Sequence, residues 1–206
     1  MHFCLHFLKA VQSVWGRRSK IGLLGNAIDV ESTEWLGEIS GVGAGSDSFY
    51  EYLVKSYILF GDTAYLEMFE QSYDQIRKYL RRGREQCNSG TGPYPYYANG
   101  NMHDGRTMTN WIDSLSAAWP GILVLAGQSL DEAVCNHLIF FAIWVKFGLL
   151  PERFDLHRLE PVLSFYPLRP ELAESTYLLY QATKNPFYLH VGRTMLQSIN
   201  KYTRSR

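Results

Sequence analysis

Two stretches of the chain share the same spacing of apolar and aromatic residues, and this repeat limits the fold more than any other feature of the sequence. Tyr65-Leu66 is followed by Ile76-Arg77-Lys78-Tyr79, and Tyr188-Leu189 is followed at the same spacing by Ile199-Asn200-Lys201-Tyr202. Each copy comes after an apolar helical pattern and a short turn, so each predicts a hairpin of two helices. A chain built from such hairpins is all-α, although two copies leave open that the hairpins are unrelated.

Helical patterns also fill most of the remaining chain, and Gly, Pro and Asn mark the loops between them. No segment has the apolar run that a strand of a parallel sheet needs, and only Gly22–Val30 has the character of a strand or hairpin. The basic residues at 81–84 are expected to close a helix, because cations stabilise its C-terminal end. The predicted helices cover residues 1–15, 46–60, 63–80, 131–147, 170–182 and 186–202, with another helical region broken at Pro120-Gly121.

Composition and charge exclude several classes of protein. The 206 residues suit one domain or part of a larger one, and a hydrophobic content of 46% excludes a disordered chain. The 20 Lys and Arg residues balance the 20 Asp and Glu residues, which argues against an electrostatic binder of nucleic acid. Aromatic residues make up 15% of the chain. This level fits either rings that stack on flat apolar ligands such as sugars or an aromatic core.

The sequence shows neither a membrane-spanning segment nor an evident signal peptide. Its first 15 residues are interrupted by Lys9 and lack a small-residue cleavage site, so they predict an amphipathic helix. The apolar run 138–150 is too short to cross a bilayer and contains Lys146. The cysteines have no metal-binding pattern and their redox state stays open. They are Cys4, Cys87 and Cys135.

Two pairs of acidic residues open predicted helices at corresponding ends of the two hairpins. Asp47 and Glu51 are four residues apart, and Glu171 and Glu174 are three apart, so each pair lies on one helix face. The structural alternative is that acids in a first turn stabilise the helix dipole and that residues 48–51 form a capping box. Because the pairs open matching helices of the two hairpins and lie among aromatic residues, we expect the four carboxylates to converge in one concave site. Hydrolysis of a glycosidic bond requires such paired carboxylates.

Other candidate ligands carry a weaker signal. Asp113 precedes a helical region and Glu152 follows a proline, so each is interpreted as a helix cap as readily as a ligand. His2 and His6 are four residues apart but lack a third ligand, which argues against zinc. The glycine-rich segment 41–45 does not follow a strand as a phosphate-binding loop does. No serine or cysteine nucleophile motif is present.

Four long strings carry a family resemblance: GVGAGSDSFYEYLVKSYILFGD, WIDSLSAAWPGILVL, GLLPERF and YPLRPELAESTYLLYQATKNPFYL. They resemble glycoside hydrolase family 47, and within it the first subgroup of the endoplasmic-reticulum degradation-enhancing α-mannosidase-like proteins. The resemblance runs from about residue 8 to about residue 202. It implies an all-α fold, an incomplete (α/α)7 barrel of helical hairpins with short β-hairpin insertions. It also implies that residues 1–206 form a single domain, the central part of a catalytic barrel truncated at both ends.

The family resemblance implies an activity and a set of site residues. The family consists of inverting α-1,2-mannosidases that trim high-mannose N-glycans and use calcium. Its motifs imply that Asp47 is one of the catalytic acids and that Glu171 is the base that activates water. The implied partners are N-glycans on misfolded glycoproteins and the degradation machinery of the endoplasmic reticulum, in whose lumen the protein would lie. The implied substrate-binding residues are Glu51, Asp113, Glu152, Arg169 and Glu174.

Two motifs of the family are not present in this sequence. One is an F-E-x-x-I-R motif with the third catalytic carboxylate, and the other contains the calcium-binding threonine, expected beyond Arg206. We therefore expect no metal ligand in this chain and no activity from the chain alone. An incomplete barrel is also expected to leave apolar helix faces uncovered, such as those of Phe140, Phe141, Ile143 and Trp144. The alternatives to a mannosidase are a lectin-like protein that binds high-mannose glycans without turnover and a helical scaffold with no sugar site.

Overall fold

The computed structural model describes the backbone of residues 2–204 and the side chains of residues 9–204. These residues belong to two compact units, and each unit is described by itself. The first comprises Met1–Arg81 and Tyr97–Thr109, and the second comprises Arg82–Tyr96 and Asn110–Arg206. No helix in the described range has both the length and the apolar character to cross a membrane. The side chains of His2, Cys4 and His6 lie outside the described residues.

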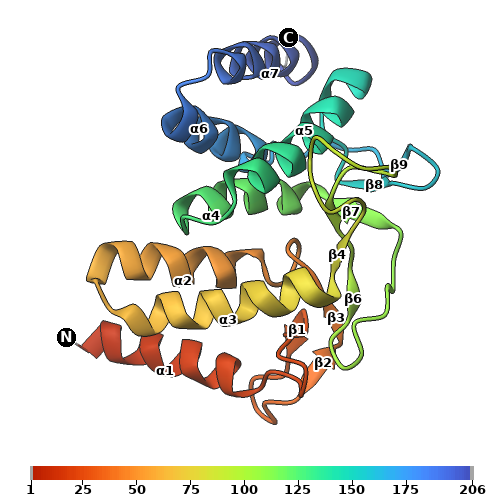
Figure 1. The fold of residues 1–206 in the computed structure, drawn as a ribbon. Helices are drawn as coiled ribbons and strands as arrows, with labels where there is room; N and C mark the ends of the chain where they lie inside the picture. Colours follow the sequence, from red (N-terminus) through yellow and green to blue (C-terminus); the bar gives the residue numbers. More distant parts are fainter. Residues whose placement is uncertain (1, 205–206) are drawn as a thin grey trace. The chain divides into compact units, whose positions relative to one another are not determined.

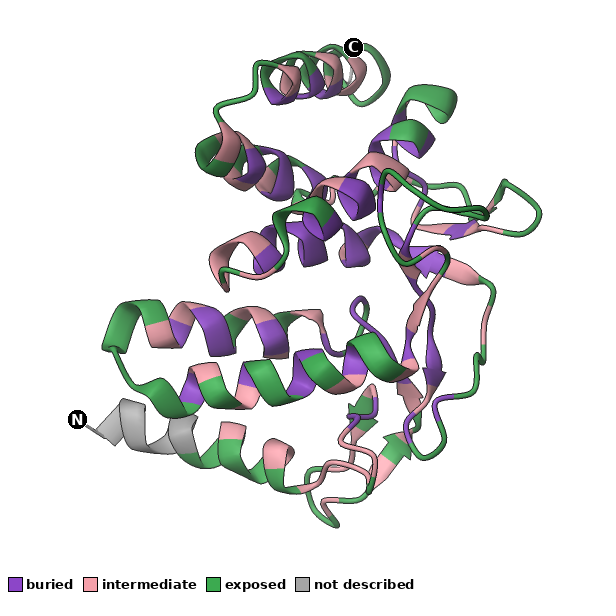
Figure 2. Ribbon diagram, viewed as in Figure 1, coloured by how far each residue is buried: buried purple, intermediate pink, exposed green. Residues whose placement is uncertain are grey.

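The first unit is built on a helical hairpin, as the repeat predicts (Figure 1). Helix α2 ends at Gly61, whose left-handed φ of 72° lets its N–H reach the carbonyl of Tyr57. Asp62 then caps helix α3 by accepting a hydrogen bond from the N–H of Ala64 at 3.0 Å. Each helix buries one face and exposes the other (Figure 2). The unit contains α1 (His2–Gly16), β1 (Ala27–Ile28), β2 (Trp35–Gly37), β3 (Ile39–Ser40), α2 (Asp47–Phe60), α3 (Thr63–Tyr79) and β6 (Gly100–Asn101).

The start of α2 differs from the sequence prediction. Ser46 occupies the N-cap position, but its hydroxyl donates to the carbonyl of Gly41 at 2.8 Å and does not cap the helix. Because the helix begins at Asp47, Ser48 lies inside it and the predicted capping box is wrong. Glu51 forms an ion pair with Lys55 on the next turn.

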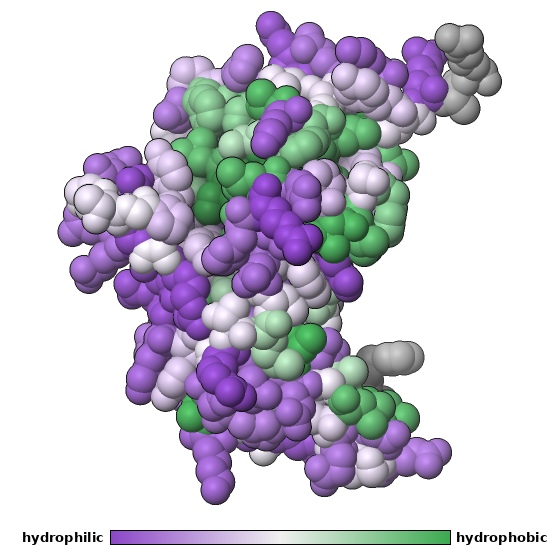
Figure 3. All heavy atoms as spheres, turned by 90° about the vertical axis from the view of Figure 1, so that its right-hand side faces the viewer, coloured by the Kyte–Doolittle hydropathy of each residue, from purple (hydrophilic) through white to green (hydrophobic). Residues whose placement is uncertain are grey.

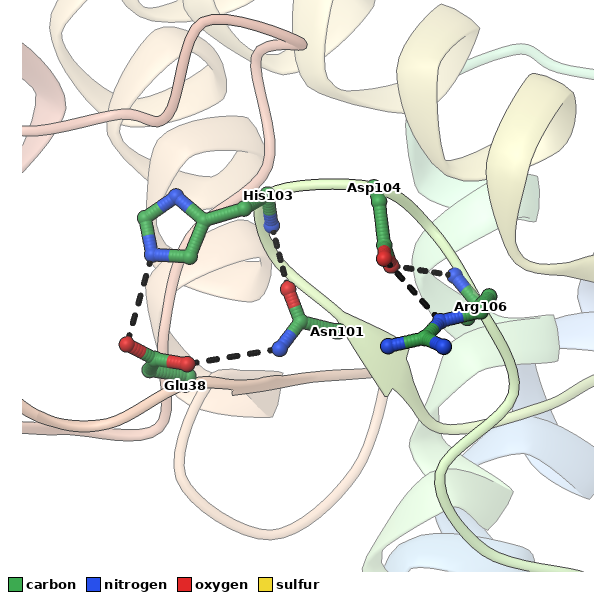
Figure 4. A network of polar contacts seen from close by, with 5 residues as sticks. All are labelled: Glu38, Asn101, His103, Asp104 and Arg106. Atoms are coloured by element: carbon green, nitrogen blue, oxygen red, sulfur yellow. Dashed lines mark hydrogen bonds and ion pairs between the residues drawn. The ribbon is translucent and has the colours of Figure 1, made fainter.

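Two short antiparallel ladders and a polar network order the loops of the first unit. β1 lies within the segment 22–30 that was predicted to have strand or hairpin character and pairs with β2, which lies beyond that segment, and β3 pairs with β6. Next to β6, the carboxylate of Glu38 accepts from Nδ2 of Asn101 at 3.3 Å and lies 3.5 Å from Nε2 of His103 (Figure 4). Asp104 accepts from Nε of Arg106 at 3.0 Å in the same loop. Most of these side chains are exposed, so the network shapes a surface loop.

The second unit contains the other copy of the helical hairpin, α6 and α7. Tyr188 of α7 is buried to the same degree as its counterpart Tyr65 of α3, each 4% exposed. Helix α6 also contacts α4, α5 and the short 3₁₀ helix η1, so it is the helix that links the others. The unit contains β7 (Trp111–Asp113), η1 (Ser114–Ala118), α4 (Trp119–Leu125), α5 (Leu130–Phe147), β8 (Arg153–Asp155), β9 (Glu160–Leu163), α6 (Glu171–Thr183) and α7 (Phe187–Tyr202).

Helix α4 includes the two residues that were expected to interrupt it. Pro120 lies in the first turn, where its missing N–H would have no helical partner in any case. Gly121 follows it within the same helix. The prediction of a break at Pro120-Gly121 is therefore wrong.

The core of the second unit covers the residues that were expected to be exposed. Phe140, Phe141, Ile143 and Trp144 are between 1% and 9% exposed, because they face β8, α6 and α7 rather than solvent. The expectation of uncovered faces at these positions is wrong. The exposed apolar stripe of α5 lies elsewhere on the helix and includes Val145, which is 58% exposed.

A disulfide joins the 82–96 segment to α5. Cys87 and Cys135 are bonded, with their Cα atoms 5.7 Å apart, and both side chains are buried. The segment begins at β4 (Arg81–Arg82) and returns at β5 (Tyr96–Tyr97), and the two strands pair. The basic residues expected to close α3 thus lie in and after a strand, and the cations in the last turn of that helix are Arg77 and Lys78.

Candidate active site

Glu152 is held by two segments that lie apart from it in the sequence. Its backbone N–H donates to the carbonyl of Phe165 at 3.1 Å, and its own carbonyl accepts from the N–H of Ser114 at 3.0 Å. Its carboxylate accepts a further bond from the Ser114 hydroxyl at 2.7 Å. The antiparallel sheet β7-β8-β9 brings these segments together. With a side chain only 14% exposed, Glu152 points its carboxylate in one fixed direction.

Arg169 meets that carboxylate with two hydrogen bonds. Nε donates to Oε2 at 3.1 Å and Nη2 donates to Oε1 at 2.7 Å. Paired bonds of this kind fix orientation as well as contributing energy. The hydrogen bond from Arg169 is the main reason that the pKa of Glu152 lies below its ordinary value of 4.5, although partial burial acts the other way. Glu152 is therefore ionised at neutral pH and has no proton to give.

Two further carboxylates act on Arg169. Its hydrogen bond to Glu152 raises the pKa of Arg169 most, and the charges of Glu152, Glu171 and Asp113 raise it further. Asp113 is buried, 4% exposed, at the end of β7, and caps η1 by accepting from the N–H of Ser116 at 3.1 Å. Asp113, Glu152 and Glu171 thus all lie within electrostatic reach of Arg169.

Glu171 is the first residue of α6, and Glu174 follows on the same face one turn later. The positive end of the helix dipole favours the ionised form of a carboxylate at this position. Burial first and the charge of Glu171 second raise the pKa of the Tyr166 phenol. The Tyr166 hydroxyl donates to the carbonyl of Arg169 at 3.1 Å, and its ring packs edge-on against Trp144. Tyr166 is thereby bonded to the turn that leads into Glu171.

The turn that leads into α6 is strained. Leu168 has a φ of 59°, in the left-handed region, which costs a non-glycine residue on the order of 1–3 kcal/mol. The bonds that Arg169 makes with Glu152 and Tyr166 hold this turn in place. Strain of this kind concentrates at functional sites, so this turn is a further reason to treat the neighbouring cluster of charged residues as a candidate site.

Ser175 fixes α6 against η1 and α4. Its hydroxyl donates to the carbonyl of Ala117 at 2.5 Å and accepts from the N–H of Gly121 at 2.9 Å. Position 121 favours glycine, because a Cβ there would lie 3.0 Å from Oγ of Ser175. This contact fixes the position of α6, which begins at Glu171, relative to η1, which directly follows Asp113.

The acids Asp47 and Glu51 belong to the first unit. Asp47 is the first residue of α2, Glu51 lies one turn later, and both are half-buried. Asp47 thus takes the same position in its hairpin that Glu171 takes in the other. The convergence of Asp47 and Glu51 with Glu171 and Glu174 joins residues of different units and stays a prediction.

The second unit also has an apolar hollow of about 790 Å³ on α5. Side chains of α5, β8 and the following turn line it, including Leu138, Ile139, Phe154 and Leu159. Apolar residues gather on this side of the molecule (Figure 3). The hollow contains none of the candidate acids, so it is separate from the polar cluster around Arg169.

The model of the family described as "Glycosyl hydrolase family 47" matches residues 2–206. The chain belongs to this family. It is 52% identical over 190 residues to the ER degradation-enhancing alpha-mannosidase-like protein 1 of Schizosaccharomyces pombe, over 92% of this chain and 23% of that protein. It is 46% identical over 199 residues to the alpha-mannosidase I MNS5 of Arabidopsis thaliana, over 96% of this chain and 33% of that protein. The chain therefore spans a third or less of the length of these relatives.

A solved structure shares the fold of this family 47 chain. The alpha-1,2-mannosidase from Trichoderma reesei matches with a TM-score of 0.67 and 19% identity, over 80% of this chain and 39% of that one. A likeness at this identity concerns the fold alone. It confirms the predicted fold class, a helix-rich architecture of hairpins with short β insertions.

The residues described in this family 47 chain do not fit a calcium site. No group of three or more His, Cys, Asp or Glu residues among them is arranged to hold a metal ion. Calcium takes six to eight oxygen ligands, and the best-placed carboxylate, that of Glu152, is already engaged by Arg169 and Ser114.

Three residues that shape the polar cluster were not predicted. Ser114 and Ser175 each bond across more than thirty residues of sequence, and nothing in their local sequence indicates such partners. The Tyr166 hydroxyl donates to the carbonyl of Arg169, and this bond is not indicated by the sequence either. The resemblance implies substrate binding for Glu152, Arg169 and Asp113, which stays a prediction, whereas the contact between Glu152 and Arg169 is seen only in the fold.

Proposed function

We propose that this chain is part of an α-1,2-mannosidase-like glycosidase that trims high-mannose N-glycans on misfolded glycoproteins during endoplasmic-reticulum-associated degradation. The observation that carries the proposal is the polar cluster at the start of α6, in a chain that matches glycosyl hydrolase family 47 along its length. Relatives that bear degradation-enhancing α-mannosidase-like names support the cellular role. The solved α-1,2-mannosidase supports the fold that the reaction uses.

The pair formed by Glu152 and Arg169 is suited to bind a sugar. The ionised carboxylate accepts hydrogen bonds from hydroxyl groups, while the guanidinium donates them. Because each partner fixes the other, both are oriented before a ligand arrives, which reduces the entropy lost on binding. Asp113 adds a buried negative charge within reach of Arg169. We assign Glu152, Arg169 and Asp113 to binding, with Glu51 and Glu174 as further binding residues.

The catalytic roles fall to Glu171 and Asp47. A base must be ionised to take a proton from water, and the N-terminal position of Glu171 in α6 favours the ionised form. Inversion then needs an acid on the opposite side of the glycosidic bond, with the two carboxyl groups about 6.5–9.5 Å apart. Asp47 holds the equivalent position in the other hairpin and is one of the catalytic acids in this scheme.

The disulfide supports a location in the lumen of the endoplasmic reticulum. Cys87 and Cys135 are both buried and bonded to each other. Disulfides form and persist in oxidising compartments and are rare in the cytosol. The proposed lumenal location places the enzyme in the compartment where its glycoprotein substrates fold.

The proposal is tested in a hybrid in which this chain replaces the 199 matched residues of the Arabidopsis relative. The assay measures mannose released from a high-mannose N-glycan and, separately, binding of that glycan. Glu171→Gln is expected to reduce turnover by about 10²- to 10⁴-fold, the usual contribution of a general base, and to leave binding largely intact.

The matched control is Glu67→Gln, an exposed glutamate on α3, which is expected to leave turnover unchanged. Glycan binding without turnover in the parent hybrid would favour the lectin-like alternative. Turnover that survives Glu171→Gln would contradict the assignment of the base. The 206-residue chain, assayed alone beside the hybrid, is expected to release no detectable mannose.

A further inference from the structure

Trp35 stands between two hollows in the first unit, away from any assigned role. Its indole Nε1 donates to the carbonyl of Arg17 at 2.7 Å, which fixes the orientation of the ring. The ring also rests on the backbone at Gly25, where a Cβ would lie 2.6 Å from Trp35 Cε3. The indole is only partly buried, so a fixed aromatic surface remains open to a ligand.

The larger hollow has a volume of about 560 Å³. This lies within the range of roughly 300–1,000 Å³ that is usual for sites of small molecules. Its other walls are polar and include Gln12, Ser13, Arg17 and Glu34. An amide, a hydroxyl, a guanidinium and a carboxylate therefore surround one aromatic ring.

Arg17 is an ordered part of this wall. Its Nη1 donates to the carbonyl and the hydroxyl of Ser13 at 2.8 and 2.6 Å, and its Nε donates to the carbonyl of Thr33 at 2.8 Å. These bonds tie the end of α1 to the β1–β2 hairpin, so the hollow has a defined shape. Because three of the donor contacts of Arg17 go to neutral protein oxygens and Glu34 lies beside it, the hollow does not favour an anion.

The smaller hollow connects Trp35 with the start of α2. It measures about 180 Å³ and is lined by Trp35, Phe49, Asn26 and Ser46, among others. Ser46 and Phe49 flank Asp47, the candidate catalytic acid. Trp35 is thus shared by a polar hollow and by a hollow next to the proposed reaction centre.

We propose that Trp35 and the larger hollow form an accessory subsite for pyranose residues of the oligosaccharide beyond the mannose that is cleaved. A sugar ring offers an apolar face of C–H groups, which packs on an indole, and an edge of hydroxyls, which bond to planar polar side chains such as Gln12, Arg17 and Glu34. The chemistry of the hollow matches both features. This subsite rests on the proposed function for its ligand class, but it is made entirely of residues in the first unit.

The test uses the 206-residue chain and measures binding of a free high-mannose oligosaccharide by calorimetry, and the shift of the Trp35 indole N–H resonance by NMR. Trp35→Ala is expected to weaken binding about tenfold or more, the effect of removing one aromatic anchor. Glu34→Gln tests the same hollow without a risk to folding, because this side chain is exposed, and is expected to weaken binding several-fold. Glu31→Gln is the matched control, since Glu31 lies on the same hairpin outside the hollow.

The outcomes separate this inference from the proposed function. A shifted indole resonance, with losses for Trp35→Ala and Glu34→Gln but not for Glu31→Gln, supports the subsite. Binding that neither variant weakens overturns the subsite and leaves the glycosidase proposal standing. A parent chain that binds no oligosaccharide also overturns the subsite, because every group it needs is present. Failure of the proposed function shows instead in the hybrid, as turnover that does not depend on Glu171.

Discussion

Replacing Ser175 by alanine should destabilise the second unit more than any other change of a single hydroxyl described above. Ser175 is fully buried and links two helices: its hydroxyl donates to the carbonyl of Ala117 and accepts from the N–H of Gly121. Gly121 lies in the first turn of α4, where N–H groups have no partner four residues earlier within the helix. The serine hydroxyl takes the place of that partner.

The size of the effect follows from the two groups that Ser175→Ala leaves behind. A buried donor or acceptor without a partner costs about 1–3 kcal/mol. Alanine occupies almost the same space as serine, so loss of packing adds little. With one donor and one acceptor affected, we expect the free energy of unfolding to fall by about 2–6 kcal/mol.

Urea denaturation measures the total, and amide hydrogen exchange at Gly121 locates it. The exchange rate of this amide should rise more than the rates of amides elsewhere in α4. Thr194→Ala is the control, because the Thr194 hydroxyl bonds only to a carbonyl of its own helix, that of His190, at the surface. A loss below about 0.5 kcal/mol for Ser175→Ala, or one equal to that of the control, would refute the reasoning.

Two further predictions concern pH and the disulfide. Burial lowers the pKa of His137 from its ordinary value of 6.5 to about 4. Between these two pH values the unfolded chain binds a proton that the folded chain does not. The stabilisation is therefore complete above pH 6.5 and is lost as the pH falls toward 4, by roughly 3 kcal/mol in all. Urea titrations between pH 7 and pH 5 should show this loss in the parent and not in His137→Gln, and an equal slope in both would contradict it. Removal of the Cys87–Cys135 bond, which closes a loop of 48 residues, should cost about 4 kcal/mol in the chain-entropy model. Denaturation of the Cys87→Ser, Cys135→Ala double variant with and without reductant checks this, because only the parent should respond to the reductant.

The helices were predictable because their signals are local. The hairpin turn at Gly61-Asp62 follows from a left-handed glycine and an aspartate cap, both of which can be identified in the sequence. The capping box at residues 48–51 was misassigned for a physical reason: a serine three residues before a glutamate forms one only if the helix starts there. In the structure α2 begins one residue before Ser48, and the hydroxyl of Ser46, at the N-cap position, donates to the carbonyl of Gly41 instead of capping the helix.

The contacts of the polar cluster were beyond local prediction. Ser114, Glu152 and Arg169 meet only because β7, β8 and β9 pair antiparallel, with Ile112 opposite Phe154 in the register. Strands of three or four residues carry too little periodicity to be recognised. The disulfide shows the same limit, since three cysteines allow more than one pairing and the fold selects Cys87 with Cys135.

The repeat is the reason to expect that an acid of one hairpin acts together with an acid of the other, and this convergence stays a prediction. Asp47 and Glu171 are each the first residue of the first helix of their hairpin, and each follows a segment with a buried or half-buried polar anchor, Ser46 in one and Arg169 in the other. In a ring of such hairpins, one operation that relates neighbouring copies brings all the first helices to face the same axis in the same direction. The N-terminal ends of those helices, with their positive dipoles, then point to the same mouth of the ring. In such a ring we expect carboxylates at those ends to be stabilised as anions and to face a shared space, which is what a site that divides proton transfer between two carboxyl groups requires.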